Sequence, residues 1–231
     1  MKISHFTIAL LHSPRFILML GVFAAYFFGW VFSEIAEEIW IEKEIFPLDQ
    51  ITSAWMADGQ HPLGQQLFSA LTMLGSFKWL AVLALAVAGL LIYKKLRLES
   101  IILLGGFALT AISIILIKFL SDRTRPYSNL SLLENTMSFP SGHMAHSLFV
   151  YGFLAYLLSR CVRNRMHSLW IMISGVGLAG MIGISRLYLN VHWLSDVLAG
   201  FTLAAAYLCL CIAYLESARH NNNEALPNKI I

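Results

Sequence analysis

The residues best suited to chemistry stand where one apolar run ends and the next begins. His192 and Asp196 are four residues apart in "NVHWLSD", a spacing that puts both side chains on one face of a helix. A carboxylate at that spacing can accept a hydrogen bond from one ring nitrogen and leave the other nitrogen free to attack. Arg186 stands six residues earlier. A non-catalytic hydrogen bond at a membrane surface is the alternative for the His–Asp pair.

A second group of charges follows the apolar run that ends at Lys118. Arg125 comes after six intervening residues, and Arg123 lies between the two. Cations this close favour an anion site, because a guanidinium group makes bidentate contacts to phosphate. Positive charge that pairs with lipid headgroups is the alternative.

The stretch "SFPSGHMAHS", residues 138–147, leads from a polar segment into another apolar run. Ser141 suits the N-cap of a helix, and Gly142 lets a ligand approach the backbone closely. The free amides of such a helix start bind anions, and His143 beside them can move a proton. An ordinary helix cap is the alternative. His146 lies on a neighbouring face and is expected to pack or bond across helices.

Together these three groups indicate phosphoryl transfer. Cations can hold the equatorial oxygens while one histidine attacks phosphorus and another group protonates the leaving oxygen. The sequence shows no carboxylate cluster suited to magnesium and no Cys/His spacing suited to zinc. A site without metal or cofactor is therefore expected.

The elements that must position these groups are apolar helices. The chain is 58% hydrophobic and 13% charged, and uncharged runs of spanning length recur. About 20 apolar helical residues cross a bilayer, where only a structure with satisfied backbone groups is stable. A large soluble helical protein is the alternative that these runs oppose. We expect an all-α integral membrane protein with six transmembrane helices, at 15–33, 76–93, 100–118, 142–159, 168–186 and 193–215.

Lysine and arginine in short connections indicate the cytoplasmic side of a membrane. The segments "YKKLR" and "RCVRNR" follow the second and fourth expected helices, whereas residues 34–58 are rich in Glu and Asp. We therefore expect both termini in the cytoplasm and all three polar groups at the outer, periplasmic or extracellular, face of a bacterial cytoplasmic (inner) membrane. The net charge of +3 follows from this topology and does not indicate nucleic acid.

The sequence as a whole predicts a single membrane-embedded domain over residues 1–231, with a polar tail at 216–231. A short interfacial helical region is expected between the first two spans. Its "PLGQQLFSALTML" is either an amphipathic helix at the interface or an extension of the second span. The first apolar run lacks a small-residue cleavage site and is expected to be a span, not a signal peptide. The three cysteines predict no disulfide framework.

The pattern as a whole resembles the type-2 phosphatidic acid phosphatase superfamily, which includes lipid phosphate phosphatases. Eleven residues between positions 118 and 196 match its three motifs in order, and the six-helix layout extends the resemblance to most of the chain. The motifs are Lys118-x6-Arg125-Pro126, Pro140-Ser141-Gly142-His143 and Ser185-Arg186-x5-His192-x3-Asp196.

The resemblance implies a role for each matched residue. His192 is the implied nucleophile, which forms a phosphohistidine, and Asp196 is its orienting partner. His143 is the implied acid for the leaving group and then the base for water. The family needs no metal. The implied phosphate-binding set is Lys118, Arg125, Ser141, Gly142 and Arg186.

The expected function is hydrolysis of a phosphate monoester or diphosphate on a bacterial lipid. Phosphatidylglycerophosphate and undecaprenyl diphosphate are the leading substrates, with phosphatidic acid behind them. The expected partners are this lipid and the surrounding membrane lipids. Three alternatives remain. A phosphotransferase would use the same site to pass the phosphoryl group to another lipid or sugar. A transporter would carry charged residues deep within several spans. A haloperoxidase would share this kind of site, but the resembling haloperoxidases are soluble proteins.

Overall fold

The computed structural model describes residues 13–42, 45–128, 130 and 136–221, which form helices joined by short connections, with no strand among them. The elements are α2 (Pro14–Glu37), the π-helical segment η1 (Glu38–Glu42), α3 (Pro47–Asp58), α4 (Pro62–Met73), α5 (Phe77–Tyr93), α6 (Arg97–Leu120), α7 (Gly142–Ser159), α8 (Arg165–Tyr188) and α9 (Leu194–Asn221). The all-α class expected from the sequence is confirmed.

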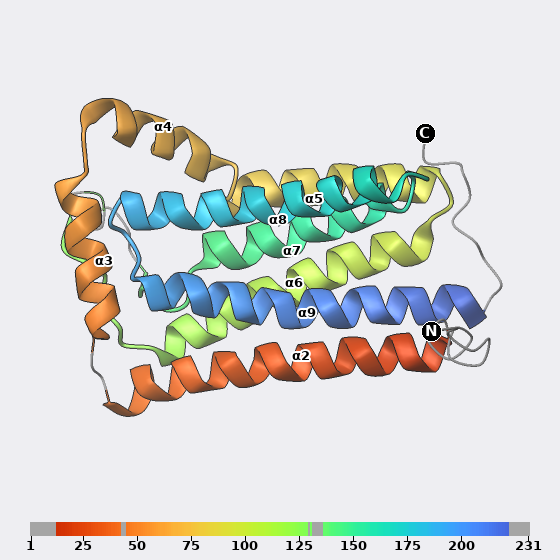
Figure 1. Cartoon of the computed structure of the whole chain (residues 1–231), viewed down its shortest axis with the longest axis horizontal. Coiled ribbons are helices and arrows are strands. Elements are labelled where there is room, and N and C mark those ends of the chain that lie inside the picture. Colours follow the sequence, from red (N-terminus) through yellow and green to blue (C-terminus); the bar gives the residue numbers. More distant parts are fainter. Residues whose placement is uncertain (1–12, 43–44, 129, 131–135, 222–231) are drawn as a thin grey trace, which may run out of the picture.

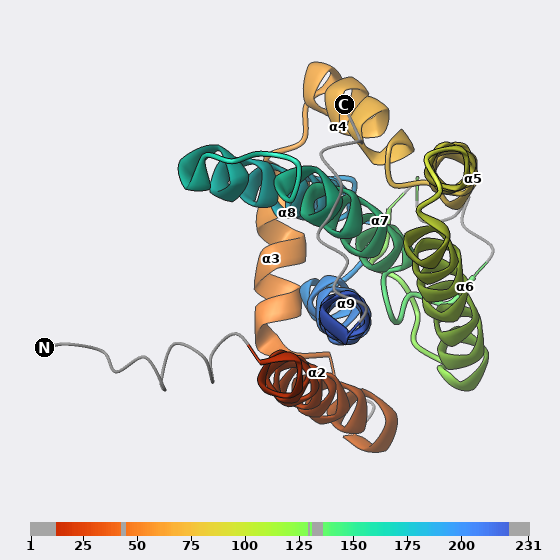
Figure 2. The same ribbon diagram turned by 90° about the vertical axis from the view of Figure 1, so that its right-hand side faces the viewer.

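The long axis of the molecule is followed by α2, α5, α6, α7, α8 and α9, which run side by side (Figure 1). Viewed along that axis, α7 lies inside the bundle, and it contacts α5, α6, α8 and α9 (Figure 2). Phe149, Val150 and Phe153 of α7 are fully buried in the main apolar core. The central helix therefore carries its apolar residues toward neighbouring helices.

Within the described part of the chain, five helical stretches are long and apolar enough to cross a membrane, namely Arg15–Ile41, Pro62–Tyr93, Arg97–Leu120, Arg165–Tyr188 and Leu194–His220. They expose large apolar side chains such as Phe23, Ile115 and Trp170 on the outside of the bundle. A surface of this kind is unfavourable in water and matches the hydrocarbon of a bilayer.

The helix α7 covers the expected range 142–159 but is not one of the five stretches. Its first two turns carry His143, His146 and Ser147, which lower its mean hydropathy. Neighbouring helices enclose it, so that few of its side chains need to face lipid. The other five expected spans coincide with α2, α5, α6, α8 and α9 apart from their ends.

Side-chain caps fix where several helices begin. Ser13 accepts a hydrogen bond from the Phe16 amide before α2, and Asn164 accepts one from the Met166 amide before α8. Ser76 occupies the corresponding position of α5. Such caps satisfy amides that have no partner inside the helix.

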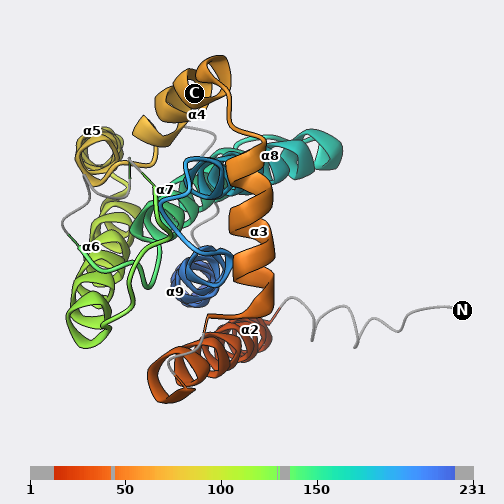
Figure 3. The same cartoon turned by 90° about the vertical axis from the view of Figure 1, so that its left-hand side faces the viewer.

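The region between α2 and α5 folds over one end of the bundle. The helix α3 crosses that end from α2 toward α8 (Figure 3), and α3 contacts both α8 and α9. The helix α4 is separate from α5 and inclined to it (Figure 1). Gly75 lies in the break between them, where a Cβ atom would collide with Ile182.

The two ends of the bundle differ in what they carry. The basic connections α5–α6 and α7–α8 lie together at one end (Figure 1). The connections α6–α7 and α8–α9, which carry the expected site residues, lie at the end that α3 crosses. Residues 216–221 of the expected polar tail continue α9, and residues 222–231 lie outside the described part of the chain.

Candidate active site

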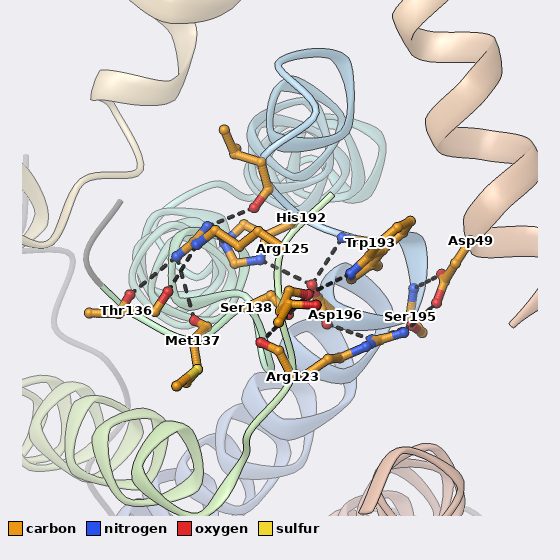
Figure 4. A network of polar contacts seen from close by, with 12 residues as sticks. Asp49, Arg123, Arg125, Thr136, Met137, Ser138, His192, Trp193, Ser195 and Asp196 are labelled. Carbon is orange, nitrogen blue, oxygen red and sulfur yellow. Dashed lines mark hydrogen bonds and ion pairs between the residues drawn. The ribbon is translucent and has the colours of Figure 1, made fainter. Parts of the chain in front are cut away.

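Three segments that are distant in sequence meet beneath α3. They are the loop after α6, the turn that begins α7, and the α8–α9 connection (Figure 4). Ser138 joins the first two, since its amide donates to the Arg123 carbonyl at 3.0 Å. Trp193 joins the first and third, since its Nε1 donates to the Thr124 carbonyl at 2.8 Å.

His192 and Asp196 are in contact, as their spacing predicts. His192 Nδ1 lies 3.3 Å from Asp196 Oδ2, and the same oxygen accepts a 2.9 Å hydrogen bond from the Trp193 amide. Both side chains are buried. The carboxylate favours the tautomer with a proton on Nδ1, which leaves the lone pair of Nε2 available.

The surroundings of His192 keep its ring neutral. Burial holds the pKa of His192 well below its ordinary value of 6.5, and the positive charges of Arg186, Arg125 and Lys118 lower this pKa further. A neutral imidazole with Nε2 unprotonated is the form that can act as a nucleophile.

Arg125 lies beside Nε2 of His192. Its Nη1 is 3.4 Å from His192 Nε2 and donates to the Val191 carbonyl at 2.6 Å. Its Nε donates to the Thr136 carbonyl at 3.0 Å, and its Nη2 donates to Thr136 Oγ1 at 3.1 Å. These bonds hold the guanidinium group where it can meet an anion approaching Nε2.

Two further cations flank this position from separate helices. Lys118, near the end of α6, donates to the Met137 carbonyl, and Arg186, near the end of α8, donates to Thr72 Oγ1 at 3.2 Å. Both are close enough for their charge to act on His192. The structure thus brings together the three cations that the sequence analysis selected.

The start of α7 adjoins these cations, because the charges of Arg186 and Arg125 act on His143 in its first turn. Ser141 occupies the N-cap position, as predicted, but its side chain makes no capping hydrogen bond. Its Oγ is buried and has no hydrogen-bond partner among the described residues. With the amide of Gly142, it presents donors at a helix N-terminus, where anions bind favourably.

The two histidines of α7 occupy different surroundings. His143 is partly buried and lies within electrostatic range of Arg186, His192 and Arg125. His146 is buried, and its ring meets Phe77 and Phe107 in edge-to-face contacts with centroids 5.5 and 5.6 Å away. His143 therefore belongs to the cationic site, whereas His146 packs between helices.

Several residues of the site were not expected from sequence. Arg123 was noted only for its position between Lys118 and Arg125, yet its side chain contacts Asp196. Asp49 and Thr72 lie in the interfacial region, where no residue was singled out. Asp49 is one of several acidic residues in that region, and no sequence pattern distinguishes it from the others.

Among the residues that the structure describes, no three or more His, Cys, Asp or Glu side chains are grouped so as to hold a metal ion. The positive charge at the site comes from Lys118, Arg125 and Arg186.

The apolar helical bundle is typical of a membrane protein, and its cationic, histidine-bearing end is suited to bind phosphate groups. The chain belongs to the PAP2 superfamily, which matches residues 77–219, from α5 to near the end of α9. The resemblance inferred from the three motifs is confirmed.

Named relatives agree with this membership. The chain is 31% identical over 147 residues to phosphatidylglycerophosphatase B of Bacillus subtilis, covering 62% of this chain and 71% of the relative. It is 31% identical over 135 residues to undecaprenyl-diphosphatase of Sulfolobus acidocaldarius, covering 56% and 59%.

A solved structure supports the fold as well. The crystal structure of a transmembrane PAP2-type phosphatidylglycerolphosphate phosphatase from Bacillus subtilis matches with a TM-score of 0.72 and 25% identity, covering 88% of this chain and 99% of that chain. The protein is thus an integral membrane lipid phosphatase of the PAP2 type, a hydrolase that acts on a lipid phosphate.

Proposed function

We propose that the protein hydrolyses a phosphate monoester or diphosphate of a bacterial lipid through a phosphohistidine on His192. The observation that carries this proposal is the position of His192, with Nδ1 against Asp196 and Nε2 3.4 Å from Arg125 Nη1. The nucleophile and a phosphate-binding cation are therefore adjacent.

In the first step, Nε2 of His192 attacks phosphorus and the bond from phosphorus to the leaving oxygen breaks. The ring becomes positively charged as the N–P bond forms, and the Asp196 carboxylate next to Nδ1 offsets this charge. His143 donates the proton that the leaving oxygen needs. This role for His143 rests on the family resemblance. Its neighbours Arg186 and Arg125 disfavour a protonated ring, and the negative charge of a bound phosphate offsets them.

The transferred group is held by donors from four elements. Lys118, Arg125 and Arg186 supply positive charge, and Ser141 Oγ and the Gly142 amide supply neutral donors. Charge-assisted contacts of this kind spread over the equatorial oxygens of the transition state. Ser141 suits this role because its Oγ is buried and has no other partner among the described residues.

In the second step, water replaces His192 on phosphorus. His143, now neutral, accepts a proton from the water, and the N–P bond breaks to release inorganic phosphate. His192 returns to its neutral state, and His143 is again protonated for the next turnover. This cycle requires no group beyond the residues named and water.

The substrates with most support are phosphatidylglycerophosphate and undecaprenyl diphosphate. The relatives support these choices, since one is a phosphatidylglycerophosphatase and another an undecaprenyl-diphosphatase. Phosphatidic acid is the third candidate. We place phosphatidylglycerophosphate first because the relative named for that activity is matched over 71% of its length, compared with 59% for the undecaprenyl-diphosphatase.

We further propose six membrane crossings, with α7 as the one enclosed within the bundle, and the site at the outer face of a bacterial cytoplasmic membrane. The basic connections at the opposite end of the bundle support this orientation through the preference of Lys and Arg for the cytoplasm.

The test measures phosphate release from the three lipids by purified protein in detergent and compares kcat/KM. His192→Ala should lower turnover by about a thousandfold or more. His167→Ala, which removes an exposed histidine at the other end of the bundle, is the matched control. An acid-labile phosphoenzyme should form in the wild type and not in His192→Ala.

Other outcomes would change the proposal in defined ways. Substantial phosphate release by His192→Ala would exclude His192 as the nucleophile. A product that forms only when a lipid or sugar acceptor is added would show a phosphotransferase that uses the same site.

A further inference from the structure

Asp49, in the first turn of the interfacial helix α3, is a buried carboxylate with a side chain only 1% exposed. It accepts three hydrogen bonds, two from Ser195 at the start of α9 and one from Arg123 in the loop after α6. Its Oδ1 accepts from the Ser195 amide at 2.8 Å, and its Oδ2 accepts from Ser195 Oγ and from Arg123 Nη2, both at 2.6 Å (Figure 4). A residue of α3 thus supplies the carboxylate that binds a first-turn amide of α9.

Arg123 connects this carboxylate to the nucleophile. Its Nη2 donates to Asp49, while its Nη1 donates to Asp196 Oδ1 at 2.6 Å and to Ser195 Oγ at 2.7 Å. The guanidinium group also lies over the ring of Trp193, 5.9 Å from its centroid. The result is a continuous series of contacts from Asp49 through Arg123 and Asp196 to His192.

This series fixes both oxygens of Asp196. Arg123 holds Oδ1, while the Trp193 amide and His192 Nδ1 share Oδ2. A carboxylate bound at both oxygens cannot rotate away from the imidazole ring without breaking charge-assisted hydrogen bonds. The direction of the His192 ring therefore depends on Arg123.

The charges of the series are also arranged for the reaction. A buried arginine with one carboxylate partner would neutralise that partner, and Asp196 would then have little charge left to offset the imidazole ring. Asp49 gives Arg123 a second carboxylate. One cation between two carboxylates leaves one negative charge, which can balance the positive ring that forms with the N–P bond.

We propose that Asp49 and Arg123 are positioning residues of this reaction, which orient Asp196 and preserve its negative charge toward His192. The inference rests on the proposed role of His192 as nucleophile. Asp49 lies outside residues 77–219, the part of the chain that matches the family, so this contribution comes from the interfacial region.

The charged and titratable groups around His192 come from every element that packs against it. They are Lys118 from α6, Arg123 and Arg125 from the following loop, His143 from α7, Arg186 from α8, Asp196 from α9 and, behind Arg123, Asp49 from α3.

The test is the pH dependence of kcat/KM in Asp49→Asn and Arg123→Gln. The acidic limb of the profile is the fall of kcat/KM at low pH, where His192 becomes protonated. Loss of the Asp49 charge makes protonated His192 less favourable, so this limb should move to lower pH. Loss of the Arg123 charge has the opposite effect and should move the limb to higher pH. Each shift should be about half a pH unit or more. The ionisation of the substrate is the same for every variant and cannot produce these differences.

The rate and a conservative variant provide further readouts. We expect kcat to fall by about tenfold in both variants with KM changed by less than about twofold, because both side chains lie behind Asp196 and are nearly buried. Arg123→Lys keeps the charge but not the forked geometry. It should keep the acidic limb near its wild-type position while kcat remains low.

The matched control is Glu99→Gln, which removes one partner of the buried Glu99–Arg219 ion pair between α6 and α9. It should lower thermal stability and leave the acidic limb in place. Acidic limbs that coincide with the wild type in both Asp49→Asn and Arg123→Gln would overturn the inference, even where stability falls. If Asp49→Asn is not recovered folded, the direction of the shift in Arg123→Gln decides the question. Failure of the proposed function would be distinguishable from failure of this inference, because turnover would then persist in His192→Ala.

Discussion

The amide of Ser141 donates a 3.0 Å hydrogen bond to the carbonyl oxygen of Asp196. The helix start that we propose to bind phosphate is thereby joined, backbone to backbone, with the helix turn that carries Asp196. Gly200, one turn beyond Asp196 on α9, allows this close approach. A Cβ atom at Gly200 would lie 2.5 Å from the Ser141 carbonyl oxygen.

Gly200→Ala should therefore separate α7 from α9 at the site. Because backbone atoms cannot move aside as a flexible side chain can, we expect kcat/KM to fall by about tenfold to a hundredfold. The control is Gly177→Ala in α8, where an added Cβ would meet nothing within 4 Å. Phosphate release and thermal unfolding of both variants provide the measurement, and equal activity of the two would contradict the argument.

Ser141→Ala tests whether the buried hydroxyl binds the transferred group. Loss of a hydrogen bond to a charged ligand costs about 1.5–3 kcal/mol, so kcat/KM should fall by roughly tenfold to a hundredfold. Ser147→Ala is a matched control, because Ser147 is on the same helix and its Oγ is likewise buried without a partner among the described residues. A similar loss in both variants would point to packing of α7 instead of phosphate binding.

The pH dependence of the wild type follows from the surroundings of His192. Because burial and nearby cations hold its pKa well below 6.5, the neutral, nucleophilic ring persists as the pH falls through 6.5. The acidic limb of kcat/KM that reports His192 should therefore lie below pH 6.5. Profiles with a monophosphate and a diphosphate lipid separate the enzyme from the substrate, since only the enzyme's limb is common to both. A common limb at or above pH 6.5 would contradict the prediction.

The helices could be predicted from sequence because bilayer-spanning runs without charge are local features. The end of α6 at Lys118 and the start of α7 at Gly142 carry residue types that already indicate phosphate chemistry. The contribution of Asp49 could not be predicted, because it is one of seven acidic residues between positions 34 and 58. Its contact with Ser195 joins residues 146 apart and depends on how α3 crosses the bundle. Tertiary placement, not local pattern, selects this carboxylate.

Membrane orientation can be tested by cysteine labelling. In a background without Cys161, Cys209 and Cys211, we expect Tyr127→Cys to react with an impermeant reagent from outside intact cells or spheroplasts, because this side chain is 87% exposed beside the site. Arg163→Cys, in the basic α7–α8 connection, should react only after permeabilisation. Labelling in the reverse pattern would place the site in the cytoplasm.

Vanadate and chelators test how the site balances the charge of phosphate. Because Lys118, Arg125 and Arg186 supply the positive charge, we expect EDTA to leave turnover unchanged. Vanadate should inhibit in competition with the lipid, because it adopts the five-coordinate geometry of the transition state and can bond to His192 Nε2. Vanadate should also raise the thermal unfolding midpoint of the wild type but not of His192→Ala, since ligand binding stabilises only the protein that binds it. A sharp loss of turnover in EDTA that is restored by a divalent metal would show that cations from the chain alone do not suffice. Equal stabilisation of His192→Ala by vanadate would show that the anion binds without the proposed nucleophile.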